Sequence, residues 1–264
     1  MTALVLICSL VLAPEPNNLA QPLTASSRIV IPVAGNTEGA LGTHYRSDIT
    51  ILNFRQSVQR VRLDWLPQAG GTQIDPVFID INAVSGSRYE DFVRQVLNVS
   101  GLGSIVVTGV TQAGIHDPGA LLWISSRIWT PQPETNGTTS QSLMTIPFDS
   151  VNTTVASIFG LRRSNQYRLN VGIVNLDPAR EQRFQITDPM PLGAPPLLHT
   201  VTLPPLTMQQ ITLPAFASDN PQIIVDNVTP AATRSNLWVT YGVSVDNVTG
   251  DSWTELGITP TVVP

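Results

Sequence analysis

The side chains best suited to contact a ligand are gathered in one alternating segment, residues 122–129 (LWISSRIW). Strict alternation places its aliphatic residues on one side of a strand and Trp123, Arg127 and Trp129 on the other. If the aliphatic side faces the core, both tryptophans and the arginine face outward. Exposed tryptophan beside arginine is typical of a sugar-stacking surface or a protein interface.

A later segment, residues 235–245 (SNLWVTYGVSV), repeats this pattern and leaves Trp238 on the side opposite its aliphatic residues. We therefore include Trp238 in the candidate ligand or partner surface. The alternative is that a loop or the neighbouring domain covers Trp123 and Trp238, since tryptophan is highly buried on average.

No group of residues suited to catalysis is apparent in the sequence. His44, His116 and His199 are expected in a loop, a turn and a strand, without the close spacing of zinc ligands. Residues 246–251 (DNVTGD) bring oxygen atoms together, but these residue types favour a tight hairpin turn over a calcium loop. The only cysteine is Cys8, and the chain has no lysine, which excludes a Schiff-base amine. We predict a non-enzymatic protein without a catalytic residue, metal or cofactor.

The segments that must position these residues occur twice. Residues 45–53 (YRSDITILN) return as residues 167–175 (YRLNVGIVN), and the segment with Trp123 returns as the segment with Trp238. Because the matched blocks keep their order, the repeated unit has the size of a domain rather than of a solenoid repeat. We predict a signal-like segment and polar linker over residues 1–27. Two β-sandwich domains are expected over 28–143 and 144–264.

Alternating residues and regularly spaced turn signals predict an all-β fold with two tandem immunoglobulin-like antiparallel β-sandwich domains. Strands are expected at residues 28–33, 61–65, 77–82, 104–110 and 120–130, and at 166–175, 181–187, 197–203, 207–213, 221–226 and 235–245. The exception lies in the first domain, where the apolar spacing of residues 89–97 predicts a short amphipathic helix. Ser87 and Glu90 would form its capping box.

The repeated R-x-(D/N)-hydrophobic-x-(I/L)-(L/V)-N strand, together with a last hairpin reading YGVSVDNVTGD, resembles the tandem β-sandwich modules of secreted bacterial proteins. The resemblance covers both domains and its motifs are structural. It implies export and an immunoglobulin-like fold, and it assigns no role to any residue.

Charged residues make up 12% of the chain and the net charge is −5, which argues against a nucleic-acid partner. Residues 1–13 form an apolar run that is too short for a transmembrane helix and is typical of a secretory signal. We therefore expect no stable transmembrane span and a secreted or cell-surface location. Cleavage of this segment, lipid modification at Cys8 and retention all stay open.

These patterns predict an extracellular or cell-surface structural or adhesive protein that acts through its β-sandwich surfaces, with other surface proteins or copies of itself as partners. One alternative is a filament subunit whose retained apolar segment adds a strand to a neighbour's open sheet edge. The side chains that would enter that sheet are Leu4, Leu6, Leu10 and Leu12. Another alternative is a glycan-binding module that holds a polysaccharide on Trp123, Arg127 and Trp129.

Overall fold

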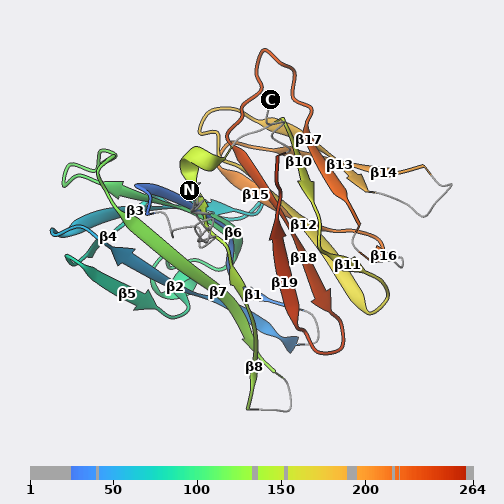
Figure 1. Ribbon diagram of the computed structural model, residues 1–264, viewed down its shortest axis with the longest axis horizontal. Helices are drawn as coiled ribbons and strands as arrows, with labels where there is room; N and C mark the ends of the chain where they lie inside the picture. Colours follow the sequence, from blue (N-terminus) through green and yellow to red (C-terminus); the bar gives the residue numbers. More distant parts are fainter. Residues whose placement is uncertain are drawn as a thin grey trace, which may run out of the picture.

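Two β-sandwiches lie side by side in the computed structural model of the chain (Figure 1). The structure describes residues 25–39, 42–132, 136–151, 154–188, 195–215, 218–219 and 221–259. Nearly all regular structure in these ranges is antiparallel β-strand, which confirms the predicted all-β fold. No helix in this part of the chain is long and apolar enough to cross a membrane. The strand-donor candidates Leu4, Leu6, Leu10 and Leu12 lie outside the described residues.

The first sandwich contains β1 (Arg28–Glu38), β2 (His44–Asn53), β3 (Gln59–Pro67), β4 (Val77–Ile81), β5 (Ser85–Tyr89), α1 (Phe92–Gln95), β6 (Gly101–Val110), β7 (Leu122–Pro131) and β8 (Thr138–Leu143). A connection follows with β9 (Ile146–Pro147) and the 3-10 turn η2 (Phe148–Ser150). The second sandwich contains β10 (Val155–Ile158), β11 (Arg162–Arg163), β12 (Tyr167–Asn175), β13 (Gln182–Asp188), β14 (Leu197–Leu203), β15 (Thr207–Thr212), β16 (Ser218–Asp219), β17 (Ile223–Asn227), β18 (Trp238–Asp246) and β19 (Ser252–Leu256).

Both sandwiches repeat one strand order, which explains the duplication in the sequence. In the first, one layer runs β4-β3-β6-β1 and the other β5-β2-β7-β8, and the end of β1 also pairs with β2. In the second, the layers run β14-β13-β17-β10 and β15-β12-β18-β19. An immunoglobulin constant domain pairs its first strand with its second and its seventh with its sixth. Here the first strand pairs with the sixth and the seventh with the second, so these two strands have exchanged layers.

The last residue of the repeated YR motif is a buried asparagine that ties the two layers of each sandwich together. Nδ2 of Asn53 donates to the carbonyls of Ser57, Ile81 and Asn82 at 2.8, 3.3 and 3.1 Å. Nδ2 of Asn175 donates in the same way to the carbonyls of Arg180, Leu203 and Pro204 at 2.9, 3.1 and 2.9 Å. In each copy Oδ1 accepts the backbone N–H two residues further on. The motif therefore has a structural role, because buried backbone groups must be paired.

Helix α1 closes one end of the first sandwich and is shorter than predicted. Phe92, Val93 and Leu97 are buried in the core, as the apolar spacing requires. The expected capping box is wrong, because Ser87 lies in β5 and pairs with Ile51 of β2. The helix begins instead after Asp91, which has a left-handed backbone and no side-chain capping bond.

Besides the apolar core of each sandwich, a third apolar cluster joins the two sandwiches. Val30, Val33, Leu66 and Val106 from the β4-β3-β6-β1 layer meet Val174, Met208, Val239 and Tyr241 from the β15-β12-β18-β19 layer. A register irregularity between Ile31 and Ala34 lets Val30 and Val33 both face the second sandwich. Backbone bonding continues across the junction, since the N–H of Ala69 donates to the carbonyl of Met208 at 2.8 Å. Sheet faces packed in this way hold the two sandwiches as one unit.

Candidate binding surfaces

The segment predicted to contact a ligand forms β7, in the middle of an outer layer of the first sandwich. Leu122 and Ile124 are buried in the core, as the alternation predicted. Trp123, Arg127 and Trp129 are half-buried on the opposite side of the strand. The alternation therefore places these three side chains on one face, with the tryptophans at either end.

The neighbouring strand β2 contributes residues that the sequence analysis missed. Register places Arg46 opposite Trp129 and Asp48 opposite Arg127. The Arg46 guanidinium lies 5.4 Å from the centroid of the Trp129 ring, within cation–π range. Arg88, on the adjoining β5, is on the same side and is largely exposed. We call Arg46, Arg88, Trp123, Arg127 and Trp129 the Arg–Trp face.

Asp48 fixes the geometry of this face. Its Oδ1 accepts from Trp129 Nε1 at 2.9 Å and from the Asp91 N–H at 3.1 Å, and its Oδ2 lies 3.4 Å from Arg88 Nη2. Asp48 is 8% exposed, so these bonds are shielded from solvent. Arg127 donates to the Thr138 hydroxyl at 3.2 Å. The indole of Trp129 is thus held in place before any ligand arrives.

The alternation in β2 could have revealed this contribution. In residues 46–52 (RSDITIL) the buried Ile49 and Ile51 alternate with Arg46, Asp48, Thr50 and Leu52. What the sequence does not show is that β2 and β7 are adjacent, because that pairing departs from the immunoglobulin order.

Trp238 does not belong to an exposed surface. It is 1% exposed and packs against Phe184 with the ring centroids 5.1 Å apart. The expectation that its side of β18 faces solvent is wrong. Trp238 lies in the core of the second sandwich, and the other side of β18, which carries Val239, Tyr241 and Val243, faces the first sandwich or the cavity beside it.

The three histidines each have a polar neighbour. His116 Nε2 lies 3.0 Å from the Ser27 hydroxyl, and His44 Nδ1, at the start of β2 rather than in a loop, lies 2.8 Å from Glu38 Oε1. His199 Nε2 is 3.5 Å from Asp188 Oδ2. A nucleophile and base work together when a third group orients the base. Within the described ranges no carboxylate bonds to the His116 ring, and no three His, Cys, Asp or Glu side chains are grouped as metal ligands.

Residues 246–251 form the tight turn that their composition predicts. The N–H of Gly250 donates to the Asp246 carbonyl at 2.8 Å, and Gly250 has a positive φ of 74°. The Val248 N–H donates to Asp246 Oδ1 at 2.8 Å. This bond, with others from Thr249 and Gln166, holds the pKa of Asp246 below its usual value because it favours the ionised carboxylate.

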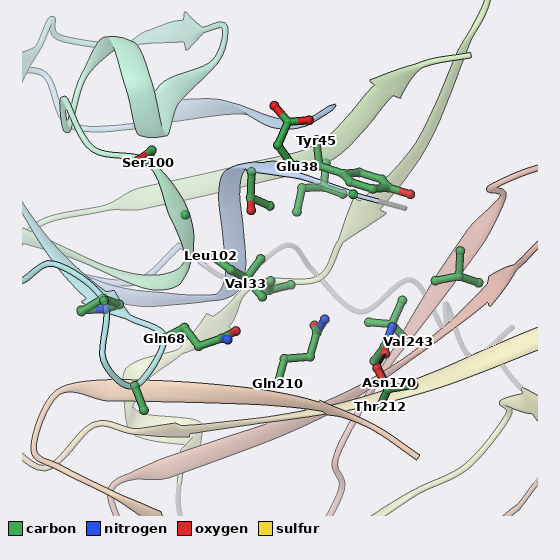
Figure 2. Close-up of a pocket in the computed structure, with 18 of the residues that line it drawn as sticks. Val33, Glu38, Tyr45, Gln68, Ser100, Leu102, Asn170, Gln210, Thr212 and Val243 are labelled. Carbon is green, nitrogen blue, oxygen red and sulfur yellow. Dashed lines mark hydrogen bonds between the residues drawn. The ribbon is translucent and has the colours of Figure 1, made fainter. Parts of the chain in front are cut away.

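A cleft of about 700 Å³ opens beside the apolar junction of the two sandwiches (Figure 2). Val33 and Leu102 lie on the side of the first sandwich, with Gln68 and Tyr45 near them. The floor comes from β12, β15 and β18. Its side chains are Arg168, Asn170, Gln210, Thr212, Val243 and Val245. Most polar groups in this cleft are uncharged amides and hydroxyls.

Tyr241 lies beside the cleft floor and orients the side-chain amide of Gln210, which belongs to that floor. Its ring packs over Gly172, where a Cβ atom would come within 2.0 Å of the tyrosine Cζ. This contact explains why the second copy has glycine where the first has Thr50. Burial raises the pKa of Tyr241, so its hydroxyl stays protonated and donates to Gln210 Oε1 at 3.1 Å.

The cleft was not predicted, because its residues come from many strands of both sandwiches and from loops that are distant in sequence. Comparisons of the chain with protein-family profiles, with curated proteins and with solved structures found no match. The function proposed below therefore depends on the chemistry of the Arg–Trp face.

Proposed function

We propose that this protein is a non-enzymatic structural or adhesive protein of the cell surface or extracellular space, and that its Arg–Trp face binds an acidic polysaccharide. The observation that carries the proposal is the ordered arrangement of three arginines around Trp129 on one sheet face. The apolar N-terminal run supports export, and the cysteine-free sandwiches do not depend on disulfide bonds.

The chemistry of the face favours an acidic ligand over a neutral one. Arginine forms paired hydrogen bonds with carboxylate groups, and tryptophan packs against the C–H face of a sugar ring. Asp48 lies within the face, but it is buried and its oxygens already bond to Trp129 and Arg88. The accessible ionic groups of β2 and β7 on this face are therefore Arg46 and Arg127, while Arg88 on β5 also lies 3.4 Å from the exposed carboxylate of Glu90.

Binding to alginate, an acidic polysaccharide, and to dextran, a neutral one, tests this proposal. We expect the protein to bind alginate, to bind dextran at least tenfold more weakly and to lose affinity for alginate as the salt concentration rises. Arg127→Gln should weaken alginate binding by about tenfold or more, because a hydrogen bond to a charged group contributes about 1.5–3 kcal/mol. The measurement is bio-layer interferometry on the full chain.

Arg180→Gln is the matched control, because it makes the same change in net charge at an exposed position in the second sandwich. Equal losses of affinity in the two variants would show that only net charge matters. Equal binding of dextran and alginate would contradict the proposed ligand. Surface labelling of intact producing cells tests the location separately.

A further inference from the structure

On the cleft floor, the side-chain oxygens of two amide residues accept hydrogen bonds from the protein, whereas their side-chain nitrogens donate none within the described part of the chain. Asn170 Oδ1 accepts from the Thr212 hydroxyl at 2.6 Å, and Gln210 Oε1 accepts from the Tyr241 hydroxyl at 3.1 Å. Asn170 Nδ2 and Gln210 Nε2 have no hydrogen-bond partner among the described residues. Asn170 is 8% exposed and lines the cleft, where its Nδ2 is available to a ligand. Figure 2 shows Gln210 rising towards Val33 and Leu102.

The wall opposite these donors offers an acceptor. Gln141 of β8 is 7% exposed and lines the same cleft. Its Nε2 donates to the hydroxyl of Thr254 on β19, which leaves Oε1 without a partner in the described structure. A ligand group that both accepts and donates hydrogen bonds, such as an alcohol, matches two donors and one acceptor.

The charged groups of the cleft do not select an ion. Glu38 bonds to His44 at 2.8 Å, and Arg168 donates to Asn247 Oδ1 at 2.9 Å. The two charges are opposite in sign and each already has a partner. A ligand without net charge therefore fits better than an anion or a cation.

The apolar residues of the cleft suit a ring with C–H faces. Val33 and Leu102 lie on one wall and Val243 on the floor, while the aromatic ring of Tyr45 lies beside Glu38 (Figure 2). The Tyr45 ring packs closely against Gly39, where an added Cβ atom would lie only 2.4 Å from Tyr45 Cε2. The volume of about 700 Å³ is within the usual range of small-molecule sites, about 300–1,000 Å³.

We propose that the cleft between the two sandwiches binds a short neutral saccharide, with Asn170 and Gln210 donating to its hydroxyl groups and Gln141 accepting from one. This site is separate from the Arg–Trp face and takes a ligand of different charge. It does not depend on the function proposed for that face.

The test is ¹⁵N NMR of the full chain titrated with maltose, cellobiose, lactose and diacetylchitobiose at millimolar concentrations. We expect at least one disaccharide to shift the side-chain NH₂ signals of Asn170 and Gln210 in a saturable way. Gln210→Met should weaken that binding by about threefold to tenfold, the usual contribution of one hydrogen bond. Because the shifts are measured on the unmodified protein, the test stands even if Gln210→Met folds poorly.

Gln209→Met is the matched control, since neighbouring residues of β15 face opposite sides of the sheet. It should leave saccharide binding unchanged. The proposal is overturned if none of the disaccharides shifts these signals, if the shifts occur at Trp129 instead, or if only a neutral Gly-Ser-Thr-Gly peptide shifts them. Arg127→Gln should leave saccharide binding unchanged, which separates this result from the alginate experiment.

Discussion

Replacing Asn175 with alanine tests whether the repeated asparagine holds each sandwich together. Asn175 is completely buried, and its Nδ2 reaches three carbonyls while Oδ1 accepts the Asp177 N–H at 3.1 Å. Alanine would leave these backbone groups without a partner at the point where β12 meets the end of β14.

The size of the effect follows from these contacts. The two Nδ2 hydrogens are shared among three carbonyls, so the side chain makes about three full hydrogen bonds. At about 1 kcal/mol of net stability each, Asn175→Ala should lower the free energy of unfolding by about 3 kcal/mol. Asn175→Asp should destabilise more, because it turns a carboxylate oxygen towards the carbonyls of Arg180, Leu203 and Pro204.

Urea unfolding followed by tryptophan fluorescence measures this loss, with Asn82→Ala as the control. The Asn82 side chain is exposed and only its backbone carbonyl contacts Asn53, so its replacement should change stability by less than about 0.5 kcal/mol. Asn53→Ala should resemble Asn175→Ala, because the first copy makes the same contacts. Equal stability of Asn175→Ala and Asn82→Ala, or a more stable Asn175→Asp than Asn175→Ala, would refute the reasoning.

Three further predictions concern other parts of the structure. Asp188→Leu should destabilise the protein by about 3–5 kcal/mol in thermal melts because it leaves Arg163 buried without its carboxylate, whereas adding Arg163→Met should recover most of the loss. Because the folded-state pKa of Asp246 is lowered, its ionisation stabilises the hairpin at neutral pH, and this contribution is lost as the pH falls through that pKa. Melting curves between pH 6 and 2 should therefore show the difference between wild type and Asp246→Asn shrinking in acid, and a constant difference would contradict this. Val106→Asp places a charge in the apolar junction, so small-angle X-ray scattering should show a larger radius of gyration if the sandwiches separate, and an unchanged radius would count against the junction as described.

The sequence was most informative where side chains alternate along one strand. Residues 197–203 and 167–175 were predicted as strands almost to the residue, because their apolar positions and bounding turns are local signals. The short strands β5 and β19 were not predicted as separate elements. Residues 85–89 (SGSRY) lack an apolar alternation, and β5 forms because β2 offers it a pairing edge.

Which side of a strand faces solvent was harder to predict than the strand itself. In β7 the aliphatic side faces the core, and the expected outward position of Trp129 follows from it. In β18 both sides are buried, because the side with Trp238, Thr240 and Ser244 packs in the sandwich core and the apolar side packs against the first sandwich or beside the cleft. Trp238 is therefore buried, and only the packing of the two units decides this. The cleft was not predicted either, because it also depends on how the two sandwiches pack together.

The two copies close one end of their cores by different means, although they keep the same strands. Equivalent positions of β3 and β13 hold Trp65 and Asp188, two residues after Leu63 and Ile186. Trp65 needs Gly103 beside it, because a Cβ there would approach the indole to 2.4 Å. Asp188 needs Arg163, which reaches it from β11 at 2.6 Å with both side chains fully buried. Neither residue could replace the other alone, since a carboxylate without arginine would be an unpaired buried charge. The strand order therefore survived divergence, while each core end required a coordinated change on two strands.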